Sequence, residues 1–215
     1  MFFIYKKYKP IFQKNRLYYF LIFIFQIQLL LSEKVLASGA YDKGTATGKG
    51  RFEISITINP YGLIPYGQNY SVMSYGLNEK MDLVGYYSSH QNGTESQYLG
   101  VLYQFYKSKN LDLATAIGMR YQDSGINDLF APQLLYNYHL NQNYSIGGSI
   151  VKVFQQNSLN DKGTAIDITL YRNIDNFIFN DKIKNIYIGL GIFKNSEKNL
   201  LKDRLYFHYS LDIVF

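Results

Sequence analysis

The chain has 215 residues, yet it contains no cysteine and no tryptophan and only four prolines. Without cysteine there is neither a disulfide framework nor a thiolate metal site. The length favours a single domain. Aromatic residues are nevertheless abundant, with 22 tyrosines and 15 phenylalanines. A tyrosine ring is apolar at one end and polar at the other, so this composition favours a protein in which many side chains lie between an apolar medium and water.

Outside the first 40 residues the net charge is close to zero. The formal net charge is +6, but residues 1–40 hold six basic residues and one acidic residue, Glu33. The remaining residues hold 16 basic and 15 acidic ones and contain no basic run that could neutralise a row of phosphates. We therefore predict no nucleic-acid partner. The basic residues of the N-terminal stretch are Lys6, Lys7, Lys9, Lys14, Arg16 and Lys34.

The N-terminal stretch has the order of a secretory signal peptide. A basic and aromatic region comes first, an apolar run, LYYFLIFIFQIQLLL, covers residues 17–31, and small residues follow in SEKVLASGA. The apolar run is shorter than the roughly 20 residues that span a bilayer. We predict cleavage after Ala37, or after Ala40, with a retained membrane anchor as the alternative. Residues 1–37 are then the signal peptide and residues 38–215 the mature domain.

After the leader, apolar residues alternate with polar or small ones. The segment 203–215 is the clearest example, because its odd positions from Leu205 to Phe215 are apolar while its even positions include His208, Ser210 and Asp212. This period of two is that of a β-strand with two different faces. The stretches of this kind are residues 51–59, 69–77, 81–89, 98–106, 111–121, 130–140, 144–155, 164–171, 185–193 and 203–215.

These stretches predict an all-β fold, a closed antiparallel up-and-down transmembrane β-barrel of about ten strands, with eight or twelve as alternatives. Most have about the 9–11 residues that cross a bilayer when tilted. Their second face is small and polar, as a lumen requires, whereas a soluble sandwich would place branched residues on both facing sheets. Because hydrocarbon offers no hydrogen-bond partners, the strand near 52–58 is expected to pair with the strand near 205–215.

The connectors between the stretches alternate in length. Short ones separate longer ones, and only residues 173–184 break the order. Short periplasmic turns and longer external loops distinguish outer-membrane barrels, and an even number of strands leaves both ends on the periplasmic side. The short connectors are 78–80, 108–110 and 141–143, and the longer ones are 60–68, 90–97, 123–129, 156–163 and 194–202.

At its C-terminus the sequence resembles the bacterial outer-membrane β-barrel family. The closing segment LYFHYSLDIVF ends in phenylalanine and has apolar residues at every second place before it, and SYGLNEKMDLVGYYS, residues 74–88, is similar to a strand–turn–strand signature of these barrels. The resemblance implies periplasmic chaperones and the barrel-assembly machinery as partners during insertion, and outer-membrane lipid as the surroundings. It implies an assembly signal made of Phe207, Tyr209, Leu211, Ile213 and Phe215.

The predicted inward faces carry charged and titratable side chains. One interpretation is the lining of a narrow pore or a binding site, and the other is a network of ion pairs that fills the interior. Eight-stranded barrels are filled by side chains, whereas open channels appear at about sixteen strands, so about ten strands favour a filled interior. The candidates are Glu53, Asp82, Asp112, Arg120, Asp167, Arg204, His208 and Asp212.

The sequence indicates no metal site and no cofactor. The chain has three histidines, and they do not stand at the spacing of metal ligands. His208 and Ser210 lie two apart on one strand face, similar to the His-x-Ser element of outer-membrane lipid A deacylases. That family has asparagine after the serine, whereas this chain has Leu211. No acid partner is evident, so a lipid hydrolase is a minor alternative.

The predicted function is that of a small, non-enzymatic outer-membrane barrel, with a structural role or a narrow pore for passive transport. The alternatives are the lipid hydrolase and a receptor or adhesin that acts through external loops. Those loops are short and polar, with few aromatic residues apart from Tyr61, Tyr66 and Phe130, which disfavours a large protein-binding surface. We also expect aspartate to be tolerated better at the inward Gly189 than at the outward Ile188.

Overall fold

A computed structural model describes residues 43–58, 69–89, 95–122, 125, 127–174, 182–194 and 206–215. The chain divides into two units, Met1–Ser32 and Glu33–Phe215, and all of the described residues belong to the second. The signal peptide predicted for residues 1–37, its cleavage site and the candidate Arg204 lie outside the described residues. Within the described ranges, no helix is long and apolar enough to cross a membrane.

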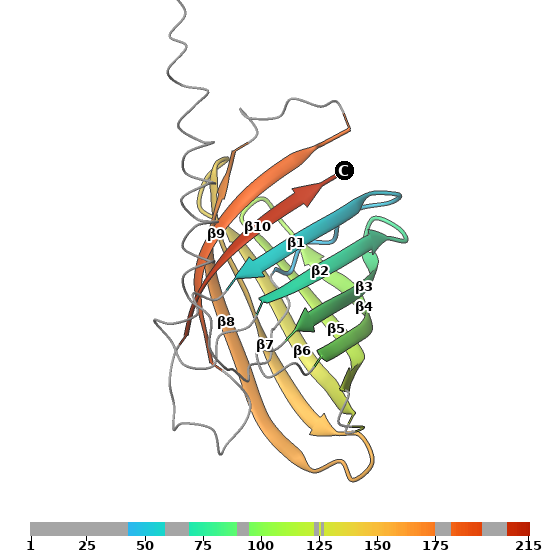
Figure 1. The fold of residues 1–215 in the computed structure, drawn as a ribbon. Helices are drawn as coiled ribbons and strands as arrows, with labels where there is room; N and C mark the ends of the chain where they lie inside the picture. The colour runs from blue at the N-terminus through green and yellow to red at the C-terminus, as the bar shows by residue number, and fades with distance from the viewer. Residues whose placement is uncertain are drawn as a thin grey trace, which may run out of the picture. The chain divides into compact units, whose positions relative to one another are not determined.

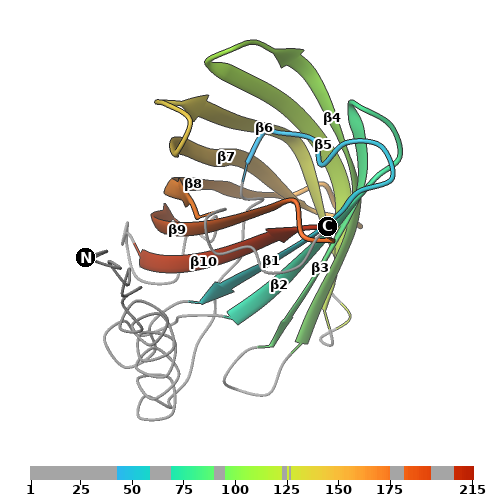
Figure 2. The ribbon, with the colours of Figure 1, turned by 90° about the horizontal axis from the view of Figure 1, so that it is seen from above.

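Ten strands form a closed barrel in the part of the chain that the structure describes. Each pairs antiparallel with its sequence neighbours, and β1 (Phe52–Ile58) pairs with β10 (Tyr206–Val214), so the ring has no open edge. Figure 1 shows the red β10 beside the cyan β1, and Figure 2 shows the strands around the interior. The predicted closed up-and-down barrel and the pairing of its first and last strands are confirmed. The other strands are β2 (Asn69–Gly76), β3 (Met81–Ser89), β4 (Glu95–Lys107), β5 (Leu111–Gln122), β6 (Asp128–His139), β7 (Tyr144–Gln155), β8 (Asp161–Asn173) and β9 (Asn185–Lys194).

The period of two places alternate side chains on opposite faces of the wall. In β9, Leu190 is 53% exposed, while its neighbours Gly189 and Gly191 are buried. In β10, Phe207 is 57% exposed and His208 is fully buried. The exterior is thus apolar and the interior contains charges, which is the reverse of a water-soluble protein and suits contact with hydrocarbon. Other large apolar side chains exposed on strands include Ile56, Met73, Leu83, Leu99, Tyr103, Ile117, Leu134, Ile150, Ile168, Leu170 and Tyr209.

The connectors differ less in length than the sequence predicts, because several strands begin earlier than the alternation indicates. β4 begins at Glu95 and β8 at Asp161, each three residues before the predicted start. Ladder pairing continues there through polar residues, such as Ser96 with Gln122. We call the end of the barrel with the tight turns 77–80, 108–110 and 140–143 the turn end, and the opposite end, which carries residues 156–160, the loop end.

An apolar cluster fills part of the interior near the loop end. The Tyr86 and Tyr98 rings stack with centroids 5.3 Å apart, and the Phe130 ring lies 5.5 Å from that of Tyr98. A Cβ on Gly118 would lie 2.0 Å from the Tyr98 hydroxyl oxygen, so the glycine in β5 makes room for this ring. The cluster continues with Val72, Val84, Leu102, Ala114, Ala116, Leu135, Val151, Val153 and Ala165.

Phe130 is not an exposed loop residue, and the prediction that placed it there is wrong. Its side chain is 1% exposed and belongs to β6. The register between β6 and β7 shifts between Phe130 and Gln133, which indicates a bulge. A bulge changes which face the following residues occupy, and Phe130 and Gln133 both lie inside although they are three residues apart.

Gly189 is a poor site for an added side chain, contrary to the expectation from the sequence. A Cβ at this position would lie 2.1 Å from Ser210 Oγ and 2.8 Å from Thr169 Cγ2. The inward direction alone therefore does not make a position tolerant, because neighbouring side chains already occupy the space above this glycine. The expected tolerance of aspartate at Gly189 stays a prediction, and this crowding argues against it.

Replacing Leu190 by arginine should destabilise the barrel in lipid by roughly 2–4 kcal/mol, the cost of such a charge on the lipid face at mid-depth. Leu190 is central in β9. The matched control is Leu159→Arg, because Leu159 is 65% exposed but lies in the connector 156–160 at the loop end. Urea unfolding of barrels inserted into lipid vesicles measures both. Equal stability of the two variants would contradict a lipid-facing exterior.

Candidate functional site

The structure places seven of the eight lumen candidates inside the barrel, each 8% exposed or less. They do not gather at one place. Arg120 lies towards the loop end, Asp167 and His208 lie at mid-depth, and the rest lie towards the turn end. Among the described residues, no group of three or more His, Cys, Asp or Glu is placed to hold a metal ion. Their role as a pore lining or binding site stays a prediction. These seven are Glu53, Asp82, Asp112, Arg120, Asp167, His208 and Asp212.

The residues of the implied assembly signal lie on the outer face of β10 and at Phe215. Phe207 and Tyr209 are exposed, while the alternate residues His208, Ser210 and Asp212 are buried. Phe215 and Phe52 exchange backbone hydrogen bonds, so the end of the chain is joined to the start of β1. The part of these residues in assembly stays a prediction.

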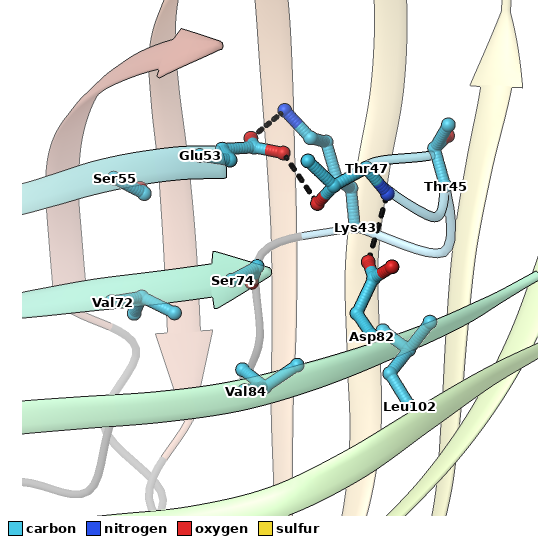
Figure 3. Close-up of a pocket in the computed structure, with 10 residues that line it drawn as sticks. All are labelled: Lys43, Thr45, Thr47, Glu53, Ser55, Val72, Ser74, Asp82, Val84 and Leu102. Atoms are coloured by element: carbon cyan, nitrogen blue, oxygen red, sulfur yellow. Dashed lines mark hydrogen bonds and ion pairs between the residues drawn. The ribbon is translucent and has the colours of Figure 1, made fainter. Parts of the chain in front are cut away.

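Of residues 43–50, which precede β1, residues 43–48 lie inside the turn end of the barrel, and Lys49 and Gly50 are exposed. The sequence analysis assigned no role to this segment. Figure 3 shows part of this segment above Asp82, with Lys43 and Thr47 directed to Glu53. Polar side chains of three neighbouring strands hold the middle of the segment. The Thr47 amide donates to Asp82 Oδ2 on β3 at 2.8 Å, the Ala46 amide to Gln104 Oε1 on β4 at 3.2 Å, and the Thr45 hydroxyl to Asp112 Oδ2 on β5 at 2.8 Å.

Lys43 ties the same segment to the seam between the first and last strands. Its Nζ lies 2.5 Å from Glu53 Oε1 on β1 and 3.1 Å from Asp212 Oδ2 on β10. It also lies 4.5 Å from the ring centre of Tyr187 on β9. Burial lowers the pKa of Lys43, but the carboxylates of Glu53 and Asp212 raise it by more, so its pKa lies above the usual value and the amine stays charged.

Glycines let the segment approach the barrel wall closely. Gly44 lies against β6, where a Cβ would be 2.6 Å from the Leu135 carbonyl oxygen. Gly76, at the end of β2, faces Gly48, whose carbonyl oxygen would be 1.8 Å from a Cβ on Gly76. The Gly50 amide donates to the Gly76 carbonyl at 2.8 Å, as the chain turns into β1. Side chains at positions 44 and 76 are therefore incompatible with this placement of the segment.

Replacing Gly44 by alanine should move residues 43–47 out of the lumen, because the added methyl group meets backbone atoms of β6 that cannot yield. Trypsin should then cut after Lys43 much faster than in the wild-type barrel, as gel electrophoresis and mass spectrometry would show. The control is Gly125→Ala, which adds the same methyl group where no atom lies within 4 Å of the added Cβ, although its φ of 75° strains an alanine there. Unchanged protection in Gly44→Ala would contradict the described placement.

Arg120 and Asp128 form a buried ion pair near the loop end. Arg120 Nε donates to Asp128 Oδ2 at 3.1 Å, and a second guanidinium nitrogen contacts the same oxygen. Lys162 Nζ lies 2.7 Å from Asp128 Oδ1. The guanidinium also lies 5.1 Å from the ring centre of Phe130. Asp128 is fully buried, and these two cations offset the cost of burying its carboxylate.

Replacing Asp128 by asparagine should destabilise the barrel by about 3–5 kcal/mol, the usual cost of leaving a buried charge without its partner. The matched control is Asp161→Asn, which weakens the ion pair with Lys152, whose two side chains are 31% and 42% exposed. That change should cost at most about 1 kcal/mol, because exposed pairs contribute little. Urea unfolding compares the two, and equal losses would refute the importance of the buried pair.

His208 has an acid neighbour that the sequence does not reveal. Its Nε2 lies 3.4 Å from Asp167 Oδ2 and 3.2 Å from Thr169 Oγ1, both on β8. The expectation that no acid partner is present is therefore corrected. The Ser210 hydroxyl has no hydrogen-bond partner among the described residues, so the imidazole is not bonded to it as a paired nucleophile and base would be.

Two cavities lie beside residues 43–47, and Lys43 and Thr45 line both. One, of about 30 Å³, is drawn in Figure 3 and is bounded by Glu53 and Asp82. The other, of about 110 Å³, is lined by the turn 141–143 and by residues of β6, β8 and β9. Each exceeds the roughly 10–15 Å³ that one water molecule needs, so the segment stands between two spaces large enough for water.

Comparisons with known proteins find similar folds but no family. No family model matches the chain, and no curated protein does. A solved structure described as "KdgM porin" has a TM-score of 0.49 and 9% identity, and the match covers 77% of this chain and 98% of that one. "KdgM porin in complex with disordered oligogalacturonate" gives the same values. "Bacterial polysaccharide outer membrane secretin" has a TM-score of 0.39 and 10% identity, over 77% of this chain and 64% of that one. Similarities of this size say nothing about what this chain binds.

Proposed function

We propose that the chain is a small integral protein of the bacterial outer membrane whose barrel lets small polar solutes pass passively. The observation that carries this proposal is the reversed distribution of side chains. Leucine, isoleucine and tyrosine cover the outside, while Asp167, His208 and Asp212 are fully buried inside. A closed wall leaves no strand edge unpaired in hydrocarbon, which is the condition for crossing a membrane with strands.

The outer membrane is favoured by the two ends of the barrel and by the leader. The first residues of β1 and the C-terminal Phe215 meet at the turn end, as an even number of strands requires. A chain exported by a signal peptide leaves both ends in the periplasm, so the turn end faces the periplasm and the loop end faces outward. A solute that enters from the periplasm then meets residues 43–50 first.

The contacts of His208 and Ser210 favour passive passage over an enzymatic function. The imidazole of His208 is turned to Asp167 and Thr169, and Ser210 is not bonded to it, so the hydrolase alternative has no assembled nucleophile. The connectors 59–68 and 195–205, on which a receptor function would depend, lie outside the described residues.

A closed structural barrel is the second candidate. It is favoured by the apolar cluster around Tyr98 and Phe130, which fills part of the interior near the loop end. The two candidates differ in one respect, which is whether the interior conducts when residues 43–47 leave the turn end.

Deleting residues 43–47 should raise the conductance of the barrel several-fold, because it removes the side chains that stand between the two cavities. Planar-bilayer recordings and the swelling rate of vesicles in small sugars measure this for the wild type and the deletion. The control is Lys49→Ala, which alters an exposed lysine of the same segment and should conduct like the wild type. If neither the wild type nor the deletion conducts, passive transport is wrong and the structural candidate stands.

A further inference from the structure

The turn end of the lumen already holds an ammonium group. Lys43 Nζ is bound by one carboxylate from each side of the seam, Glu53 and Asp212, and faces the rings of Tyr187 at 4.5 Å and Tyr171 at 5.6 Å. Carboxylates beside the faces of aromatic rings are the usual surroundings of bound organic ammonium ions. Only 12% of the Lys43 side chain is exposed, so the group is held inside the barrel.

Acidic groups exceed cationic ones at this end of the lumen. Four buried carboxylates lie there, while Lys43 is the one lysine or arginine that the described contacts assign to them. Asp112 is matched with His139 at 3.2 Å, a contact that is ionic only when the imidazole is protonated. The four carboxylates belong to Glu53, Asp82, Asp112 and Asp212.

Asp82 provides a second and independent sign of an incomplete site. Its side chain is 1% exposed and lines the cavity of about 30 Å³ together with Lys43 and Glu53. Oδ2 accepts the Thr47 amide, but Oδ1 is buried without a hydrogen-bond partner among the described residues. Figure 3 shows this carboxylate inside the cavity. A buried carboxyl oxygen that lacks a hydrogen-bond partner favours a further cationic or hydrogen-bonding occupant.

We propose that the turn end of the lumen is a binding site for small cations that carry a primary ammonium group on a short alkyl chain, and that Lys43 is its tethered occupant. A free ammonium of this class takes the position of Lys43 Nζ when residues 43–47 leave the lumen. Glu53 and Asp212 bind its nitrogen, and the rings of Tyr171 and Tyr187 line its alkyl chain. The selection of such cations during passage rests on the proposed function, whereas binding itself does not.

The substitution Lys43→Ala tests the site by removing Cγ, Cδ, Cε and Nζ, which are the atoms that n-propylammonium can restore. Equilibrium unfolding in urea is measured for the barrel purified from membranes, with n-propylammonium chloride or with potassium chloride at equal concentration. At ten times its dissociation constant, n-propylammonium should stabilise the variant by about tenfold in the folding equilibrium, whereas potassium should not. If Lys43→Ala folds poorly, the folded yield with and without n-propylammonium gives the same test.

Two matched variants show whether the effect belongs to this site. Lys49→Ala removes an exposed lysine six residues further along the segment and should gain nothing from n-propylammonium. The double variant Lys43→Ala with Asp212→Asn should lose most of the gain, because one of the two carboxylates no longer carries charge. A gain that is equal with potassium, absent with n-propylammonium, or unchanged in the double variant would overturn the proposal.

A reversal-potential measurement separates this proposal from the proposed function. Across a potassium chloride gradient, Lys43→Ala should pass cations in preference to anions more strongly than Lys49→Ala. Rescue by n-propylammonium without any conductance would support the site and refute passive transport. Conductance without rescue would support transport and refute the site, and conductance with a preference for anions would refute the selection of cations during passage.

Discussion

The structure depends on the pairing of β1 with β10. This seam closes the ring, and it also brings together the charged groups of Lys43, Glu53 and Asp212 in the interior. Ser55 on β1 donates to Asp212 on β10 at 2.6 Å, although the two residues are 157 positions apart in the chain. Glu53, two pairs further towards the turn end, completes the carboxylate pair that holds Lys43. A barrel that failed to close would therefore expose the edges of β1 and β10, and it would also lose the carboxylate pair that binds the N-terminal segment.

The N-terminal segment offsets a cost that closure imposes. Enclosing carboxylates in a narrow lumen is unfavourable unless cations and hydrogen-bond donors accompany them. Residues 43–47 supply one ammonium group from Lys43, the amide of Thr47 for Asp82, and the hydroxyl of Thr45 for Asp112. The segment is thus part of the folded interior, and the proposed passage of solutes requires that these contacts be exchanged for contacts with water or with a cation. This exchange would link the stability of the barrel to the proposed passage of solutes.

The fold was predictable because it follows from a local pattern, the period of two, which needs no knowledge of distant partners. The same pattern correctly placed the side chains of Leu190 and His208 on opposite faces. It failed where the partner comes from another strand. Asp167 meets His208 across β9, and the inward turn of Phe130 follows from a shift of register that alternation cannot display. The segment 43–50 was missed because it is neither strand nor leader, although its run of small residues, GTATG, next to a lysine is the signal that could have found it.

The interior is asymmetric, and this asymmetry limits where a solute can travel. The inner faces of β4–β7 mix apolar side chains such as Leu102, Ala114 and Leu135 with polar ones, whereas the inner faces of β1 and β10 along the seam are mostly polar and include Thr57 and Ser210. The hydroxyls of Thr57 and Ser210 belong to directly paired residues, and both lack partners among the described residues. Water or a passing polar solute can form hydrogen bonds with these hydroxyls, whereas apolar side chains offer none. We therefore expect the proposed route from the Lys43 site to follow the seam between β1 and β10, where the carboxylates of Glu53 and Asp212 and the hydroxyls of Thr57 and Ser210 lie along the same wall.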